Sequence, residues 1–271
     1  MSGRPEAFER PILFLTDFGY EDEFAGACRA VIERFAPGAR VIDLTHGIPP
    51  GDVRRGALAL EAVAGRAGPA VYLAVVDPGV GTERRGVAVR AGESFLVGPD
   101  NGLLALAARR LGGAAEAVDV SASALRLEPT APTFHGRDVF APVAAHLAAG
   151  RPLGAAGEPL DPAALIDLAL PRPRLGRGEA RAHVLYADRY GNLVLDVRAG
   201  ELELGEAVTV EAAGSSHRAA VAPTFGAVAE GELALYGDSS GWLGLAVNRG
   251  SAAELLGVGR DDEVVIRAKG G

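Results

Sequence analysis

The chain has 271 residues, 48% of them hydrophobic, which is enough for one large domain or two of ordinary size. Its formal net charge of −8 argues against a nucleic-acid surface, because phosphate binding requires clustered Lys and Arg. The single cysteine, Cys28, excludes an internal disulfide framework and suits a reducing compartment.

Apolar runs along the chain are too short for membrane insertion. The first residues, MSGRPEAFERP, lack the apolar segment of a secretory signal. The run AVYLAVV has the length of a buried strand, well below the roughly 20 residues of a membrane-spanning helix. We therefore expect a cytoplasmic protein that contacts neither membrane nor nucleic acid.

The first two-thirds of the sequence alternates strand-like and helix-like segments. Apolar runs at 12–16, 40–45 and 70–77 predict strands, and the segments that end near residue 35 and at residue 67 predict helices between them. A strand pair at 86–99 and a helix at 101–113 follow. This order predicts an α/β domain with a mostly parallel sheet and helices on its faces.

The composition of the sequence changes at 171–179 (PRPRLGRGE), which is rich in proline, arginine and glycine, as linkers are. Beyond it, short β-type runs are separated by glycine-rich turns, with one helical stretch near 251–257. Strands at such close spacing predict an all-β, barrel-like domain. We therefore expect two domains, 10–173 and 174–271.

Two carboxylates come directly after predicted strands. Asp17 follows the run 12–16, and Asp77 ends the run 70–77 ahead of a turn rich in glycine. Open α/β sheets bind ligands at the carboxyl ends of their strands, so both are candidate ligand contacts. Asp17 could accept hydrogen bonds from ribose hydroxyls or cap the following helix. Asp77 could pair with Arg84 in a functional site or in a structural salt bridge.

Two histidines lie in loops that could belong to a site. His135 lies in a glycine-flanked loop (TFHGRD) ahead of a predicted helix at 139–150. Histidine is the side chain whose unperturbed pKa lies near neutrality, so His135 is a candidate acid–base group. His46 is interpreted as a polar turn residue beside Gly47 and Pro49.

The C-terminal region contains two polar turns, DRYGN (188–192) and GDSSG (237–241). Tyr190 could stack on a base, and Asn192 could pair with its polar edge. A simple hairpin connection is the alternative, because Asp- and Asn-rich turns are common.

Several common site signatures are missing from the sequence. The Cys and His spacings of a zinc site do not occur, nor does the GxSxG elbow of a serine nucleophile. No GxGxxG follows the first predicted strand, so a nicotinamide or flavin cofactor is not indicated.

Seven motifs occur in order along the chain: TDFG, DLTHGIPPGDVRRGA, VVDPGVGTERR, GPDNG, TFHGRD, DRYGN and SGWLGLAVNRGSAAELLG. Together they resemble the S-adenosylmethionine hydroxide adenosyltransferase (SAM hydrolase) family, which is related to the fluorinases and chlorinases. The resemblance runs from about residue 12 to residue 267. It implies hydrolysis of S-adenosyl-L-methionine to adenosine and L-methionine, without a cofactor or metal, in a homotrimer with ligand sites between subunits.

The resemblance also implies roles for individual residues of the first domain. Asp77, Arg84 and His135 match the family's catalytic set, and Asp17 matches the carboxylate that holds the ribose hydroxyls.

In the second domain, the resemblance implies contacts that complete the ligand site. Asp188 matches the acid near the substrate ammonium, and Tyr190 and Asn192 match the adenine contacts. Ser239 and Asn248 match the second wall of the pocket.

The chain departs from its relatives at several of these positions. The halogenases carry Tyr in place of Asp77 and a halide-binding Ser in place of Gly136. Gly51 stands where relatives often place an aromatic ring over the ribose, and Gly244 replaces a Glu common in the family.

Hydrolysis at ribose C5′ depends on the nucleophile, because the thioether leaves readily and water has to lose a proton. Arginine cannot act as a base, so the proton goes to Asp77, to His135 or through a relay between them. We expect Asp77 to position and polarise the water, with Arg84 and His135 tuning it.

Two other function classes remain open from the residues alone. One is a metal-dependent phosphoesterase with Asp17, His46, Asp77 and His135 as ligands. The other is a non-enzymatic protein that binds adenosine or S-adenosylmethionine.

Overall fold

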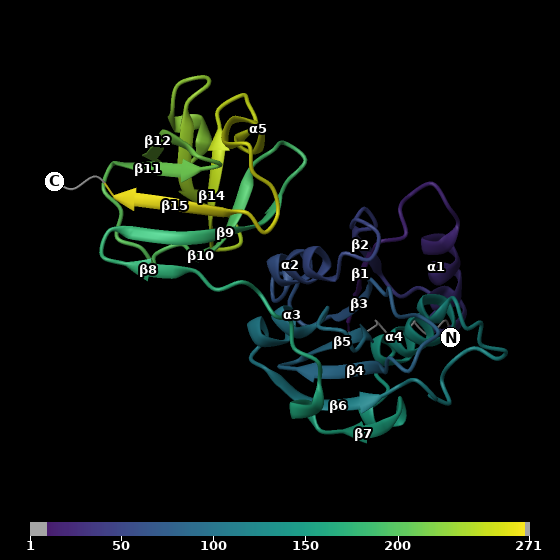
Figure 1. The fold of residues 1–271 in the computed structure, drawn as a ribbon. Coiled ribbons are helices and arrows are strands. Elements are labelled where there is room, and N and C mark those ends of the chain that lie inside the picture. Colours follow the sequence, from purple (N-terminus) through teal and green to yellow (C-terminus); the bar gives the residue numbers. More distant parts are fainter. Residues whose placement is uncertain (1–9, 269–271) are drawn as a thin grey trace, which may run out of the picture. The chain divides into compact units, whose positions relative to one another are not determined.

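The computed structural model describes residues 10–268 of the chain, which divides into two compact units, Met1–Leu168 and Ala169–Gly271 (Figure 1). In the first unit, the strands are β1 (Ile12–Thr16), β2 (Val41–Thr45), β3 (Val71–Val75), β4 (Gly86–Ala91), β5 (Ser94–Pro99), β6 (Ala114–Asp119) and β7 (Glu158–Leu160). Its helices are α1 (Phe24–Phe35), α2 (Val53–Val63), α3 (Ala105–Arg110) and α4 (Ala141–Ala148), with short helical turns η1 (Gly136–Phe140), η2 (Leu153–Ala155) and η3 (Pro162–Ala164).

The strands of the first unit form one sheet in the order β2-β1-β3-β5-β4-β6-β7. Strands β2, β1, β3 and β5 are parallel neighbours, and β4 lies antiparallel between β5 and β6. The predicted α/β fold with a mostly parallel sheet is confirmed. Strand β6 and the short edge strand β7 were not predicted.

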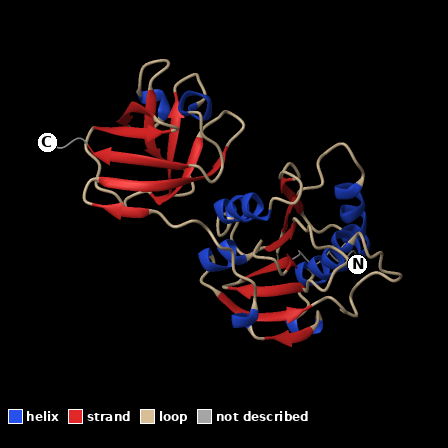
Figure 2. Ribbon diagram, viewed as in Figure 1, coloured by secondary structure: helices blue, strands red, loops and turns tan. Residues whose placement is uncertain are grey.

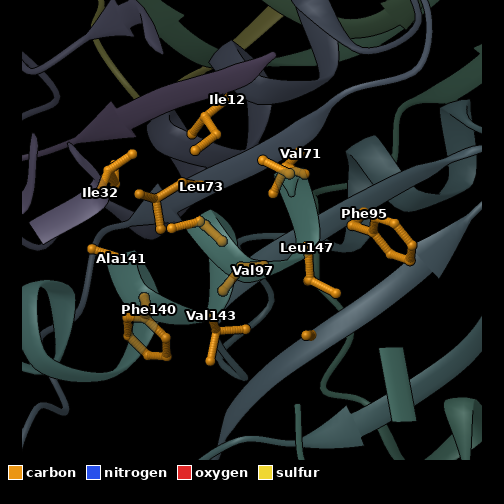
Figure 3. Close-up of a cluster of buried hydrophobic side chains, with 14 of the residues drawn as sticks. Ile12, Ile32, Val71, Leu73, Phe95, Val97, Phe140, Ala141, Val143 and Leu147 are labelled. Atoms are coloured by element: carbon orange, nitrogen blue, oxygen red, sulfur yellow. The ribbon is translucent and has the colours of Figure 1, made fainter. Parts of the chain in front are cut away.

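Helices cover both faces of this sheet, which explains why β3 is buried along its whole length. On one face, α1 and α4 pack on alternate strand residues such as Ile12, Leu73 and Val97 (Figure 3). Tyr72 points to the opposite face, where its hydroxyl accepts a hydrogen bond of 2.9 Å from the N–H of Gly65, just after α2. The buried parallel strands β1 and β3 thus lie inside the sheet, and the carboxyl ends of the parallel strands lie at one edge of it.

The second unit consists almost entirely of strands (Figure 2). These are β8 (Arg174–Gly176), β9 (Glu179–Ala187), β10 (Leu193–Arg198), β11 (Ala207–Ala212), β12 (Ser215–Val221), β13 (Leu233–Gly237), β14 (Trp242–Val247) and β15 (Glu263–Ala268). The helix α5 (Ala252–Leu256) and the turn η4 (Phe225–Ala227) complete it.

Seven of these strands close into a barrel in the order β10-β14-β13-β12-β11-β15-β9, because β9 also pairs with β10. The predicted barrel-like second domain is confirmed. The segment 171–179, expected to be a linker, contains strand β8, which pairs antiparallel with β9. Gly178, at φ +69°, makes the tight turn between them, and a three-residue strand is too short for its pattern to be read from sequence.

The barrel strands alternate between an apolar interior and an outer face. Leu235 and Leu245 point into the core, whereas their neighbours Tyr236 and Gly244 lie opposite one another on the outside. The outer side chains therefore do not pack in the core and can line a binding surface.

Neither a reactive thiol nor a membrane-spanning helix is found among residues 10–268. Cys28 is buried in α1, and burial raises the pKa of its thiol to about 12, so it serves in packing. None of the helices in this range is long and apolar enough to cross a membrane.

Candidate active site

Asp17 lies where the carboxyl ends of β1 and β3 meet. Its backbone N–H donates to the carbonyl of Val75 at 3.3 Å, and its Oδ2 accepts a hydrogen bond of 2.8 Å from the N–H of Gly51. Gly51, at φ +72°, can turn its N–H toward the carboxylate at low conformational cost. Helix α1 begins after Glu23, so Asp17 does not cap it.

The environment of Asp17 is partly apolar and partly charged. Burial raises the pKa of its carboxyl above the usual value, the N–H of Gly51 lowers it in part, and the charge of Asp77 raises it again. The charge of Asp77 therefore affects the carboxyl of Asp17 across neighbouring strand ends.

Asp77 and Arg84 form a two-point ion pair across the glycine-rich turn. The Nε of Arg84 donates to Oδ1 of Asp77 at 3.0 Å, and Nη2 of Arg84 donates to Oδ2. Their side chains are only 6% and 9% exposed, and the guanidinium lies 5.4 Å from the ring of Phe140. Gly81, at φ +78°, brings this turn so close to the carbonyl of Pro132 that an added Cβ would lie 2.9 Å from the oxygen.

His135 joins this pair through Arg84. The Nη2 of Arg84 lies 3.3 Å from Nδ1 of His135, and arginine can only donate, so Nδ1 is the acceptor. Burial lowers the pKa of His135 below its usual value, and the positive charge of Arg84 lowers it further. The ring is therefore neutral at neutral pH and carries its proton on Nε2.

The three side chains present complementary hydrogen-bonding groups. Each oxygen of Asp77 receives one hydrogen bond from Arg84 and retains a second lone pair. The Nε2–H of His135 supplies a donor. A carboxylate acceptor beside a neutral imidazole donor suits a water molecule, which can donate to the one and accept from the other.

Gly136, directly after His135, is confined by apolar groups. An added Cβ would come within 3.0 Å of the ring of Phe18 and 3.5 Å of Val75. Phe18 in turn packs edge-to-face against Phe134, at 5.8 Å between ring centroids. This side of the cluster is therefore tightly packed and carries no hydroxyl at position 136.

The four residues weighed as metal ligands are each engaged elsewhere. Asp77 and His135 bind Arg84, and Asp17 binds the N–H of Gly51. His46, 2% exposed, contacts Thr16 through Nδ1 at 2.8 Å, and its Nε2 lies 3.1 Å from Asp43. Among residues 10–268, no group of three or more His, Cys, Asp or Glu is arranged to hold a metal ion.

The second unit contains a cavity of about 470 Å³ on the outside of the barrel. Four of the predicted binding residues line it: Asp188, Tyr190, Asn192 and Ser239. Tyr190 is 68% exposed, so its ring is available for stacking.

Asp188 organises the DRYGN turn on which this part of the cavity is built. Its Oδ1 accepts from the N–H groups of Tyr190 and Asn192 at 2.8 and 3.0 Å. Its Oδ2 accepts from Nδ2 of Asn192 at 2.8 Å. The turn is a hairpin connection between β9 and β10, and it also carries residues of the cavity.

Asn248 does not line this cavity. Its side-chain Nδ2 donates to the carbonyl of Val228 at 2.8 Å, which ties the end of β14 to the loop between β12 and β13.

Sequence reasoning missed three aromatic residues of the cavity wall, Tyr186, Phe225 and Tyr236. It named the polar turn GDSSG but gave Asp238 no role, although D-x-x-G-x at 238–242 repeats the spacing of 188–192. The aromatic residues come from separate strands and a loop, and only the barrel register brings them together.

A second cavity, of about 250 Å³, lies between α3, β4 and the segment after η3. Its walls are mainly small and apolar, including Val87, Val89 and Ala108. Asp100 borders it, but that carboxylate is engaged by Arg85 and by the N–H of Ile166. None of the predicted site residues lines this cavity.

The first unit is an α/β fold with polar residues at its strand ends. The second is a closed β-barrel with an aromatic and acidic cavity. These features are those of a two-domain ligand-binding protein. The family model for the SAM hydroxide adenosyltransferase N-terminal domain matches residues 12–157, and the model for the C-terminal domain matches residues 182–265. The chain belongs to the SAM hydroxide adenosyltransferase family.

Individual relatives agree with this assignment. The (R)-S-adenosyl-L-methionine hydrolase of Salinispora tropica is 47% identical, over 95% of this chain and 97% of its own length. The (R)-S-adenosyl-L-methionine hydrolase of Thermus thermophilus is 44% identical, over 92% and 96%. A crystal structure of an uncharacterized conserved protein from Thermotoga maritima superposes with a TM-score of 0.87 at 36% identity, covering 94% of this chain and 99% of that one. The family predicted from the seven motifs is confirmed.

Proposed function

We propose that this chain is an enzyme that hydrolyses S-adenosyl-L-methionine to adenosine and L-methionine. The relatives named (R)-S-adenosyl-L-methionine hydrolase match it over nearly its whole length at 44–47% identity. The observation that carries the mechanism is the hydrogen-bonded set of Asp77, Arg84 and His135, which offers water one acceptor and one donor.

The reaction balances without a further reactant. The oxygen of water forms a bond to ribose C5′, the C5′–S bond breaks, and its electron pair neutralises the sulfonium as methionine leaves. One proton of the water is released. Asp77 orients the water and accepts its hydrogen bond, while Arg84 holds the carboxylate and His135 donates to the water oxygen.

The remaining predicted residues are proposed as substrate contacts. The carboxylate of Asp17 accepts hydrogen bonds from the ribose hydroxyls, through the lone pairs that are not used by the N–H of Gly51. Tyr190 and Asn192 contact adenine, Asp188 lies near the methionine ammonium, and Ser239 belongs to the same cavity wall. Asn248, whose amide donates to the carbonyl of Val228, is proposed to hold the loop that follows Phe225 of the cavity.

The direct test is incubation of chelator-treated protein with S-adenosyl-L-methionine, followed by chromatography of the products. Adenosine and methionine in equal amounts are expected. Activity lost on chelation and restored by a divalent ion would favour the phosphoesterase alternative, and tight binding without turnover would favour a sensor.

We also propose that the chain acts as a cytoplasmic homotrimer with ligand sites between subunits. The resemblance to the family, whose models match both parts of the chain, supports this. Light scattering should give three times the mass of one chain, and dilution below the trimer's dissociation constant should abolish turnover. A fully active monomer would rule out the shared site.

Replacement of Asp17 by alanine should weaken substrate binding more than it slows chemistry, because a ribose contact is present in both ground and transition states. Loss of a charge-assisted hydrogen bond predicts a rise in KM of about ten- to a hundredfold, with a small change in kcat. Steady-state kinetics measures both. Asp22→Ala, an exposed residue of the same loop, is the control and should leave KM unchanged. An unchanged KM in Asp17→Ala would contradict the ribose role.

A further inference from the structure

The glycine-rich turn between β3 and β4 is bound at both ends by one loop, which follows β5. At the start of the turn, the carbonyl of Val76 accepts a hydrogen bond of 2.9 Å from Nδ2 of Asn101. At its end, the carbonyl of Arg85 accepts a hydrogen bond of 2.9 Å from the N–H of Asp100. Asp100 and Asn101 are consecutive residues of the motif GPDNG (98–102), which has no part in the mechanism proposed above.

The two ends of the turn are held in different ways. At the end near Arg85, β4 pairs with β5 along its whole length, so main-chain hydrogen bonds hold the backbone there. At the other end, the pairing of β3 with β1 stops at Val75, and the carbonyl of Val76 lies beyond it. That carbonyl is bound by the side chain of Asn101. The backbone just before Asp77 therefore depends on a side chain rather than on the sheet.

The orientation of the Asn101 amide is determined by its two partners. Its Oδ1 accepts a hydrogen bond of 3.1 Å from the N–H of Leu103, which is fully buried, and its Nδ2 can only donate. Gly102, at φ +92°, makes the turn that allows this contact. At Gly98 an added Cβ would clash with the carbonyl oxygen of Ala74, so only glycine lets this loop approach the end of β3 so closely.

The carboxylate of Asp77 needs this support because it has two tasks that depend on its position. Both of its oxygens accept from Arg84, and the remaining lone pairs are those proposed to bind the attacking water. Arg84 in turn lies 3.3 Å from His135 through Nη2. Since a misplacement of about 1 Å can cost on the order of a hundredfold in rate, a shift of the backbone at Val76 would be felt in the chemical step.

We propose that Asn101 is a positioning residue for the hydrolysis, whose side-chain amide holds the carbonyl of Val76 and thereby presents Asp77 to Arg84 and to water. This inference rests on the proposed function. Asn101 acts only through Asp77 and makes no contact with the substrate. Asp100, by contrast, binds the side chain of Arg85 and is structural.

The test is Asn101→Asp, which keeps an oxygen to accept from the N–H of Leu103 but loses the donor to the carbonyl of Val76. We expect kcat to fall about ten- to a hundredfold and the KM for S-adenosyl-L-methionine to change less than about twofold, because the substrate contacts lie on other residues. Asn101→Leu, similar in size and uncharged, should show the same loss of kcat. It separates the lost hydrogen bond from the added charge and provides a second variant if the first does not fold.

A double-mutant cycle distinguishes positioning from a general structural role. If Asn101 acts through Asp77, adding Asn101→Asp to Asp77→Asn should lower kcat by less than about a further twofold, whereas independent defects would multiply. Asp100→Asn, the neighbouring residue of the same loop, is the control. It should lower the melting temperature and leave kcat nearly unchanged, because main-chain bonds still hold its end of the turn.

The inference is overturned by an unchanged kcat in both Asn101 variants, by a full multiplication of the two losses in the double variant, or by the same loss of kcat in Asp100→Asn. If the unmodified protein does not hydrolyse S-adenosyl-L-methionine, the proposed function fails. Nuclear magnetic resonance then decides whether Asn101 holds the pair, through the Nε–H of Arg84, assigned by its loss in Arg84→Lys. Its exchange with solvent should be faster in Asn101→Asp and unchanged in Asp100→Asn, and equal exchange in all three proteins would contradict the inference.

Discussion

Replacement of Asp77 by asparagine is expected to lower kcat by a factor on the order of 10²–10⁴, the range typical of positioned acid–base groups. Asparagine keeps the shape of the side chain but removes the negative charge that polarises the water. Binding of S-adenosyl-L-methionine should persist, because the ribose and amino-acid contacts lie on other residues. Single-turnover kinetics under saturating enzyme, together with calorimetric binding, separates the two effects.

A matched control is available in the same unit. Asp100 is also a buried carboxylate, with its Oδ2 bound by both Nε and Nη2 of Arg85 at 3.1 and 2.6 Å. Asp100→Asn should lower thermal stability and leave kcat nearly unchanged. If Asp77→Asn behaves in the same way, with near-normal turnover, then Asp77 is only the structural partner of Arg84.

The strand ends of the first unit could be predicted because their pattern is local. Asp17 follows the apolar run of β1, and Asp77 follows that of β3, so both lie at the same edge of the sheet. The contact of Arg84 with Asp77 was also predictable, since a short glycine-rich turn joins them. Local sequence sufficed where the partners are close along the chain.

Contacts between distant segments could not be read in the same way. The N–H of Gly51 reaches Asp17 from another loop, and only the fold determines that approach. The cavity of the second unit depends on barrel register, which sets Tyr186, Val194, Gly244 and Tyr236 in one row across four strands. A single residue of slip would turn these side chains to the other face of the sheet.

Short or irregular elements were missed for a related reason. Strand β6 (AAEAVD) contains two acidic residues and lacks a clear alternation, and its assignment rests on pairing with β4. Strand β8 has three residues and lies in a segment with the composition of a linker. Their stability comes from neighbouring strands rather than from their own sequence pattern.

The choice of nucleophile follows from the charges around Asp77. A halide ion at this position would lose its hydration shell beside the negatively charged carboxylate of Asp77, which repels it. The guanidinium of Arg84 is not free to bind the anion, because it already donates to both oxygens of Asp77. Neutral water instead gains a hydrogen bond from the same carboxylate. Gly136 offers no hydroxyl to a halide, and the ring of Phe18 leaves little room to add one.

We therefore expect water to be the attacking group even at high chloride or fluoride concentration. In ¹⁸O-labelled water, mass spectrometry should find the label on the 5′-oxygen of adenosine, and 5′-halo-5′-deoxyadenosine should stay below detection. Asp77→Asn offers an internal comparison: with the repelling charge removed, inhibition by halide should increase, because an anion can then approach Arg84. Halogenated nucleoside as the main product, or adenosine without the label, would exclude water as the nucleophile and with it the assigned role of Asp77.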